Sequence, residues 1–191
     1  MSTFNKVIII SGSSGSGKTT LVNHLMSYSE LNLVFSVSAC SRPKRPLEID
    51  GKHYLFLSIE RFKEKIKKDQ FLEWEEVYEN HFYGTLKATT NEILNSGKNI
   101  LFDVDVQGAQ SIKSYFKDQA LSLFIQAPTE KIARERLINR ETESTSAIKF
   151  RVSKIKKEIL IGEKMDYQLI NDNLNESKNK IKKLVSEFLD L

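Results

Sequence analysis

The chain has 191 residues, of which 40% are hydrophobic and 28% are charged, and its 29 lysine and arginine residues exceed its 25 acidic residues by four. This composition excludes a disordered or fibrous chain, and the length suits one domain with room for an inserted lobe. The single cysteine, Cys40, excludes an internal disulfide and a cysteine-based zinc site, and no apolar run approaches the ~20 residues of a membrane-spanning helix. We therefore expect a cytoplasmic protein.

Short apolar runs with the character of buried strands lie at residues 7–10, 99–102, 121–125 and 167–170. Helical patterns separate them, at residues 19–28, 85–95, 109–116, 129–139, 148–161 and 176–189. Strands that alternate with helices are typical of parallel βαβ units. The sequence therefore predicts an α/β fold in which a parallel sheet is flanked by helices.

The stretch between residues 36 and 84 interrupts this alternation. It contains short β-like pieces at residues 35–38 and 54–57, a helix near residues 58–68 and a loop around residues 80–84. We interpret it as a mixed α+β lobe inserted into the core. Residues 136–155 are polar and contain neither glycine nor proline, which favours a helical segment.

A phosphate-binding loop pattern, GSSGSGKT, occupies residues 12–19, after a predicted strand and before a predicted helix. Its glycines let successive N–H groups point inward, and the helix N-terminus adds a positive dipole, so the loop suits nucleotide phosphates. Lys18 would reach the β- and γ-phosphates, and the Thr19 hydroxyl would coordinate Mg²⁺. The alternative is an ordinary turn entering a helix, which the spacing, the lysine and the threonine together disfavour. The residues assigned to ATP binding here are Gly12, Ser13, Ser14, Gly15, Ser16, Gly17, Lys18, Thr19 and Thr20.

Asp103 ends the apolar run at residues 99–102, as an acid ends the second metal-binding strand of many phosphate-loop enzymes. Parallel strands of one sheet share an end, so Asp103 can lie near Thr19. Taken alone, Asp103 would be read as an ordinary residue at the end of a strand. Together with the phosphate loop, it is our second candidate for the Mg²⁺ site.

Further motifs follow the phosphate loop, and they read SVSACSRPKRPLEIDGKHYLF (36–56), FLEW (71–74), FYGT (82–85), DVDVQG (103–108) and LIND (169–172). No NKxD guanine-binding motif occurs late in the chain, which disfavours a small GTPase. The ordered set of motifs closely resembles the guanylate kinase family over almost the whole chain. The resemblance implies a phosphate-loop kinase core with an inserted GMP-binding lobe and a helical lid.

The resemblance assigns one group of residues to the phosphate of the acceptor GMP. Arg42 and Arg45 would clamp this phosphate, because a planar guanidinium binds it in a bidentate way. Tyr54 and Tyr83 would donate phenolic hydrogen bonds to it. The backbone at Gly84 and Thr85 would complete the pocket.

A second group would recognise the guanine base. Glu73 is the expected reader, because guanine presents two donors, N1–H and N2–H₂, to an ionised carboxylate, whereas adenine presents an acceptor at N1. Ser38 would donate its hydroxyl to O6 of the base, and Asp105 would assist on the guanine or ribose side. Without the family resemblance, Glu73 would be an ordinary surface acid.

The resemblance also implies a lid with catalytic arginines, Arg136, Arg140 and Arg151. Arg136 and Arg140 are four residues apart on a predicted helix and so share a face. Lid closure would bring them to the ATP phosphates and expel water, and Lys18 and Arg42 would complete the catalytic set. The alternative for these arginines is pairing with glutamates on the helix surface. We divide the single domain, residues 1–191, into a core (1–35, 86–135 and 156–191), a GMP-binding lobe (36–85) and a lid (136–155).

The implied reaction is in-line phosphoryl transfer from ATP to GMP, or to dGMP, with Mg²⁺ bridging the β- and γ-phosphates of ATP. Asn171 would lie near the adenine of ATP. Two alternatives remain within the fold: a non-catalytic phosphopeptide-binding module, and a related phosphate-loop kinase that acts on another small molecule. Nucleic-acid binding is suggested only by lysines at residues 178–183, which alternate with acids on a helical pattern. We therefore expect small-molecule substrates, with neither nucleic acid nor membrane as a partner.

Overall fold

The computed structural model describes residues 5–139 and 145–191. Its core is a five-stranded, wholly parallel sheet in the order β2-β7-β1-β8-β9. The strands are β1 (Val7–Gly12), β2 (Leu33–Phe35), β7 (Asn99–Asp103), β8 (Ala120–Gln126) and β9 (Tyr167–Ile170). The parallel sheet predicted from the alternating pattern is confirmed.

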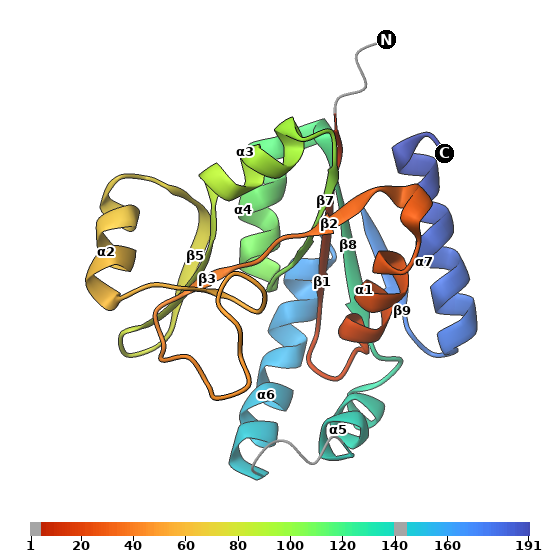
Figure 1. Cartoon of the computed structure of the whole chain (residues 1–191). Helices are drawn as coiled ribbons and strands as arrows, with labels where there is room; N and C mark the ends of the chain where they lie inside the picture. The colour runs from red at the N-terminus through yellow and green to blue at the C-terminus, as the bar shows by residue number, and fades with distance from the viewer. Residues whose placement is uncertain (1–4, 140–144) are drawn as a thin grey trace.

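Helices cover both faces of this sheet (Figure 1). On one face lie α1 (Lys18–Met26) and α7 (Leu174–Leu189), and on the other lie α3 (Lys87–Asn95), α4 (Val106–Phe116) and α6 (Thr145–Gly162). Ile8 and Ile10 enter the first core, whereas Val7 and Ile9 enter the second, and all four are fully buried. Successive residues of a strand point to opposite faces, so a continuous apolar run in β1 supplies both cores.

The inserted lobe has its own mixed sheet in the order β4-β3-β6-β5. Its strands are β3 (Ala39–Cys40), β4 (Leu55–Phe56), β5 (Phe71–Tyr78) and β6 (His81–Leu86), and its helix is α2 (Ile59–Lys67). The buried ring of Phe62 on α2 stacks on Phe71 and Phe82, with ring centroids 4.4 and 5.5 Å apart. These aromatic contacts form the small core of the lobe.

The predicted loop at residues 80–84 was wrong, because residues 81–86 form β6 and pair with β5 in an antiparallel hairpin. Strand β5 was not predicted, because its acidic residues obscure the apolar alternation. Asn80, with a φ of 60°, forms the turn between the two strands. The helix expected from residue 85 begins at Lys87, because Thr85 and Leu86 still belong to β6. Only Phe35 of the β-like piece at 35–38 lies in the core sheet, and residues 36–38 cross to the lobe.

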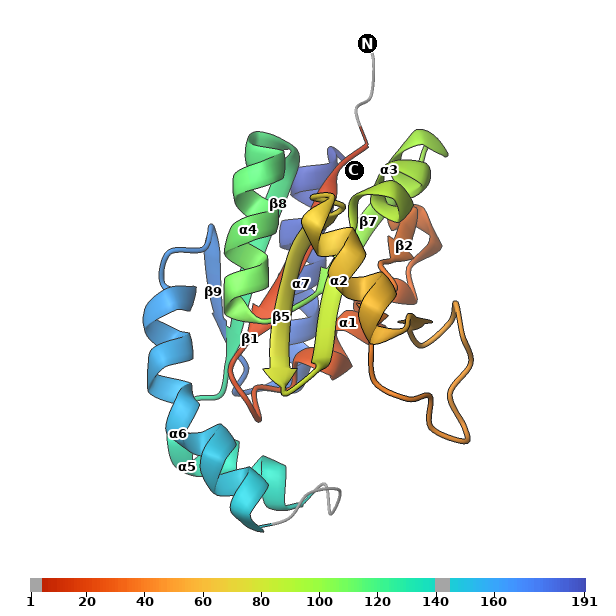
Figure 2. The same ribbon diagram turned by 90° about the vertical axis from the view of Figure 1, so that its left-hand side faces the viewer.

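The remaining elements lie around the ends of the core strands. Helix α5 (Glu130–Ile138) packs against α6, and two short 3₁₀ turns, η1 (Ser29–Leu31) and η2 (Lys117–Gln119), link core elements. Figure 2 shows α4 of the core beside β5 of the lobe, a contact that joins the two parts of the molecule. Across residues 5–139 and 145–191, no helix combines the length and the apolar character needed to span a bilayer.

Candidate active site

The phosphate loop leaves the carboxyl end of β1 and enters α1 through two glycines in the left-handed region, Gly15 at φ 76° and Gly17 at φ 85°. A Cβ on Gly15 would lie 2.3 Å from the carbonyl oxygen of Ala133, so α5 rests directly on the loop. The backbone N–H of Ser13 donates to the carbonyl of Ile125 at 3.0 Å, which ties the loop to β8. These contacts hold the loop in a defined shape. Thr19 and Thr20, in the first turn of α1, are exposed.

Asn171, directly after β9, braces the same loop. Its side-chain amide nitrogen donates to the backbone carbonyl of Ser16 at 2.8 Å. The backbone carbonyl of Asn171 accepts a hydrogen bond from Nη2 of Arg136 at 3.0 Å. Nη1 of Arg136 and Oδ1 of Asn171 are buried and have no hydrogen-bond partner among the described residues. Both residues line a cavity of about 350 Å³ beside Gly17 and Thr20. Buried polar atoms left without partners are costly, so this cavity is suited to a polar ligand.

Lys18 lies at the start of α1 and forms an ion pair with Asp103, at the end of β7. Its ammonium group also donates to the carbonyl of Val104 at 3.2 Å. The expected proximity of the phosphate loop and the Asp103 carboxylate is therefore present. Within the described ranges, no cluster of three or more histidine, cysteine or acidic side chains is arranged to hold a metal. A hydroxyl and one carboxylate do fit Mg²⁺ carried by nucleotide phosphates, because that ion keeps few protein ligands.

A carboxylate from α6 also reaches the phosphate loop, which sequence reasoning missed. Oε2 of Glu158 accepts a hydrogen bond from the backbone N–H of Ser14 at 3.3 Å. Burial raises the pKa of Glu158, and the Ser14 N–H and Lys154 act in the opposite direction. The two partners are 144 residues apart. No local motif signals such a contact, which depends on how α6 packs against the core.

A second cavity, the lobe pocket, opens between the lobe and the carboxyl ends of the core strands. It has a volume of about 220 Å³, and its lining includes Ser38, Tyr54, Glu73, Glu75, Tyr83, Gly84 and Asp105. The structure thus brings together predicted residues that are far apart in the sequence. Asp103 lines the same pocket, so the pocket adjoins the phosphate loop.

At one end of the lobe pocket, the lining residues Tyr54 and Tyr83 contact a basic residue, Arg42, and we call this the basic end. Nε of Arg42 donates to the Tyr83 hydroxyl at 3.0 Å, and the guanidinium lies over the Tyr54 ring, 5.0 Å from its centroid. The rings of Tyr54 and Tyr83 meet edge to face at 5.8 Å. This packing fixes the guanidinium and two phenols at one place, a combination suited to a phosphate or carboxylate.

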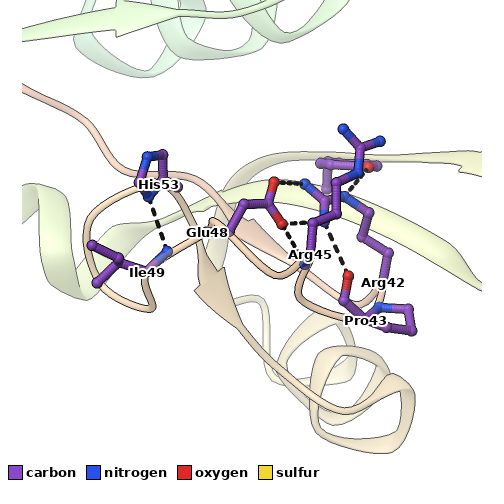
Figure 3. A network of polar contacts seen from close by, with 7 residues as sticks. Arg42, Pro43, Arg45, Glu48, Ile49 and His53 are labelled. Atoms are coloured by element: carbon purple, nitrogen blue, oxygen red, sulfur yellow. Dashed lines mark hydrogen bonds and ion pairs between the residues drawn. The ribbon is translucent and has the colours of Figure 1, made fainter.

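Glu48 occupies that basic end in this structure (Figure 3). It forms a bidentate ion pair with Arg42, with one contact of 2.6 Å, and it accepts the backbone N–H of Arg45 at 2.8 Å. The hydrogen bond from Arg42 lowers the pKa of Glu48 to about 2. Sequence reasoning did not single out Glu48, although an acid three residues after Arg45 in the same motif was a usable signal. Arg45 itself is exposed, and Nδ1 of His53 accepts the Ile49 N–H at 3.0 Å.

The other end of the lobe pocket is acidic. The Thr85 hydroxyl donates a hydrogen bond to Oε1 of Glu73 at 2.6 Å. The family resemblance assigns only the backbone of Thr85 to the pocket, and the structure adds this side-chain contact. Burial raises the pKa of Glu73 to about 7, against the opposing effect of Thr85 and with help from Asp105 and Glu75. Gly84 is required here, because a Cβ would approach the Glu73 carbonyl to 2.7 Å.

Asp105 has a structural task in addition to lining the pocket. Its Oδ1 accepts the backbone N–H of Gly108 at 2.7 Å and so caps the N-terminus of α4. A Cβ on Gly108 would lie 3.2 Å from Oε2 of Glu73, which shows how closely α4 approaches the acidic end. The acid that lines the pocket and the helix cap are therefore the same residue.

Two of the predicted lid arginines, Arg136 and Arg151, lie on different helices. Arg136 lies on α5 and contacts Asn171, as described above. Helix α5 ends at Ile138, and Arg140 lies outside the described residues. Arg151 is exposed on α6.

Comparisons with known proteins agree with this geometry. The family model described as Guanylate kinase matches residues 4–188. A guanylate kinase of Bacteroides fragilis is 47% identical over 186 residues, which cover 97% of this chain and 91% of that protein. One of Porphyromonas gingivalis is 46% identical over 184 residues, covering 96% and 98%. The crystal structure of guanylate kinase from Anaplasma phagocytophilum matches with a TM-score of 0.74 at 24% identity, covering 98% of this chain and 87% of that one, a likeness of fold.

Proposed function

The chain belongs to the guanylate kinase family, and we propose how its own residues carry out the transfer of a phosphoryl group from ATP to GMP. The observation that carries this proposal is the pairing of two sites. A pre-shaped phosphate loop lies beside a pocket that is basic at one end and acidic at the other. An ATP-dependent nucleoside monophosphate kinase requires both sites next to each other.

The lobe pocket is assigned to GMP. Arg42, Tyr54 and Tyr83 would hold the phosphate, and the exposed Arg45 would turn toward it. Glu48, which now holds Arg42 by a bidentate contact, stands where a phosphate would compete for the same guanidinium. Phosphate and carboxylate both accept the guanidinium fork, so exchange between them preserves its hydrogen bonds.

The acidic end of the lobe pocket is assigned to guanine. The Thr85 hydroxyl orients the Glu73 carboxylate, which would accept the two adjacent donors of the base. Ser38 and Asp105 line the same pocket and would contact O6 and the amino side of the nucleoside. Adenine would leave the Glu73 carboxylate without partners, and such a loss permits discrimination of about 10⁴-fold or more.

The phosphate loop and its cavity are assigned to ATP, with the adenine side near Asn171. Lys18 would leave Asp103 for the β- and γ-phosphates, and this exchange would free the Asp103 carboxylate. Thr19 and Asp103 would then hold Mg²⁺, Asp103 through water. Bound with ATP, Mg²⁺ would supply charge neutralisation on the β- and γ-phosphoryl oxygens.

Catalysis would rest on positioning and charge, because the acceptor oxygen of GMP is already anionic. Lys18, Arg42 and Arg136 would supply positive charge to the transferring phosphoryl group, and Arg140 and Arg151 would join them when the lid closes. We keep the proposed division of the chain into a lid (residues 136–155), a lobe (residues 36–85) and a core that comprises the rest. The same proposal places the enzyme in the cytoplasm and gives it small molecules, and neither nucleic acid nor membrane, as partners.

A coupled assay of ADP release tests the function directly. The enzyme is supplied with ATP, Mg²⁺ and one acceptor from GMP, dGMP, AMP, UMP and CMP. We expect turnover with the guanine nucleotides and background rates with the others. Absence of GMP-dependent ADP release would overturn the proposed function, and equal rates with AMP would overturn the role of Glu73.

Turnover of the Lys18→Ala variant tests the catalytic assignment in the phosphate loop. We expect kcat to fall by about 10²-fold or more while the KM for GMP changes little, because Lys18 acts at the transferring phosphoryl group and not on the acceptor. An effect confined to the KM for GMP would contradict this role.

A further inference from the structure

Glu75 is a second acid of β5 that faces the lobe pocket, and no motif or role described above includes it. Residues two apart on a strand point to the same side, so Glu73 and Glu75 both present their side chains to the pocket, and both line it. Glu75 is exposed, as expected of a side chain at an open pocket. Its position is therefore available to a bound nucleotide.

The register of the hairpin fixes where Glu75 lies along the pocket. Glu73 is opposite Thr85, which is its hydrogen-bond partner, and Glu75 is opposite Tyr83, which is the partner of Arg42. Alternate residues of a strand are about 6.7 Å apart, so Glu75 is displaced by this distance from the base end toward the phosphate end. In a nucleoside monophosphate, the sugar lies between the base and the phosphate.

The charges around Glu75 favour a neutral hydrogen-bond donor as its partner. Partial burial, the charge of the facing Asp105 carboxyl and a hydrogen bond shared with it raise the pKa of Glu75, and Lys154 on α6 acts in the opposite direction. An acid close to the phosphate end is unfavourable unless it accepts hydrogen bonds, and hydroxyl groups donate them without adding negative charge. The ribose carries two adjacent hydroxyls, which match the two oxygens of a carboxylate.

We propose that Glu75 accepts hydrogen bonds from the 2′- and 3′-hydroxyls of the acceptor ribose and thereby makes the enzyme prefer GMP to dGMP. The inference rests on the proposed function, because it assumes that a guanine nucleotide occupies the lobe pocket. It adds a specificity-determining residue that reads the sugar, beside Glu73, which reads the base.

The test compares kcat/KM for GMP and dGMP, at saturating MgATP, in the parent enzyme and in the Glu75→Ala, Glu75→Gln and Glu79→Ala variants. Glu79 is an exposed acid in the turn of the same hairpin, outside the pocket lining, and is the matched control. We expect a GMP/dGMP ratio of about 10 or more in the parent enzyme, as for a hydrogen bond to a charged group. The ratio should fall toward 1 in Glu75→Ala, stay intermediate in Glu75→Gln, whose amide oxygen still accepts, and remain unchanged in Glu79→Ala.

A misfolded or generally impaired Glu75→Ala variant would lose activity with both acceptors and keep their ratio, which would count against the proposal. An equal fall of the ratio in Glu79→Ala would also overturn it. Calorimetric binding of GMP and dGMP in the absence of ATP gives the same ratio without phosphoryl transfer. A parent enzyme that binds GMP but does not phosphorylate it would thus refute the proposed function while the ribose preference is still measured.

Discussion

Glu73 combines a raised pKa with a task that requires its ionised form. Its pKa lies near 7, above the ordinary value of 4.5, so the free enzyme holds a proton there in mildly acidic solution. Only the carboxylate can accept both N1–H and N2–H₂ of guanine. Because the pKa of Glu73 is higher in the folded than in the unfolded chain, this residue lowers the stability of the fold increasingly as the pH rises from about 4.5 to about 7. Over the upper part of the same range, the fraction of ionised Glu73, the form that binds guanine, increases.

We therefore expect kcat/KM for GMP to rise between pH 6 and pH 8 with an apparent pKa near 7. The Glu73→Gln variant should lose this rise, lose much of its discrimination against AMP, and gain thermal stability relative to the parent at pH 8 more than at pH 5. The comparison removes the titration of the GMP phosphate, which is common to both enzymes. A parallel pH profile in the two enzymes would assign the titration elsewhere.

Substitution of Thr85 provides a second, independent test of the pKa of Glu73. Its hydrogen bond to Glu73 opposes the rise in the pKa of Glu73, so the Thr85→Val variant, which is similar in shape, should move the apparent pKa above 7. Thr85→Ser keeps a hydroxyl and is the control. The pH dependence of kcat/KM for GMP measures the shift, and a shift to lower pH would contradict the arrangement.

Several residues of the site could be identified from the sequence, and others could not. The phosphate loop was recognisable because backbone geometry requires its glycines, and Arg42, Tyr83 and Glu73 were recognisable through motifs. Glu158 was missed because it acts through a contact between distant segments and not through a motif, whereas Glu48 lies within the motif at residues 36–56 and was overlooked there. Glu75 carries no signal of its own until the pairing of β5 and β6 places it in the pocket.

At the scale of elements, α6 connects the proposed lid to the phosphate loop. Glu158 on this helix accepts the Ser14 N–H, one of the backbone donors that we assign to phosphate. The carboxylate is thus an internal competitor for the anion site. Nucleotide binding must overcome both the lost hydrogen bond and the repulsion between this carboxylate and the incoming phosphates.

The Glu158→Gln variant should therefore bind ADP about 5-fold more tightly, because a charge near the phosphates is worth about 1 kcal/mol at high dielectric. Glu163→Gln, an exposed acid just beyond the same helix, should leave the affinity unchanged. Calorimetry at low and high salt measures both, and the gain should shrink as salt screens the charge. Weaker ADP binding by Glu158→Gln would show that this acid supports the nucleotide instead.

The strands of the lobe were the least predictable elements, for a physical reason. The core strands are buried on both faces and consist of apolar runs, which the sequence displays directly. Strand β5 has Phe71 in the lobe core but presents Glu73 and Glu75 to the pocket, so its pattern resembles a polar segment. Its strand character comes from pairing with β6 and not from its own composition.

On the scale of the whole molecule, the two proposed substrates bind to different parts of the fold. The proposed ATP site belongs to the core, and most of the proposed GMP site belongs to the lobe, with α4 and β5 in contact between the two parts. A ligand that binds only the native state at about 100 times its Kd stabilises it by about 2.7 kcal/mol. For a chain of this size, such a gain raises Tm by about 5–10 °C.

We expect GMP and ADP each to raise the Tm of the parent enzyme. Arg42→Ala should abolish the shift caused by GMP and keep the one caused by ADP, and Lys18→Ala should weaken only the latter. Thermal unfolding of the parent and of both variants, with and without each ligand, measures these shifts in Tm. Loss of both shifts in either variant would show that the two sites are not separable.

Asp105 caps α4 of the core and also lines the pocket of the lobe. Loss of a cap destabilises a protein by about 1 kcal/mol, so a substitution here alters stability and substrate contact together. Glu75, which is exposed on the lobe, caps no helix, so its substitution does not remove a cap. New acceptor preferences can therefore evolve by single changes along β5, whereas Asp105 is open to change only in a chain with stability to spare.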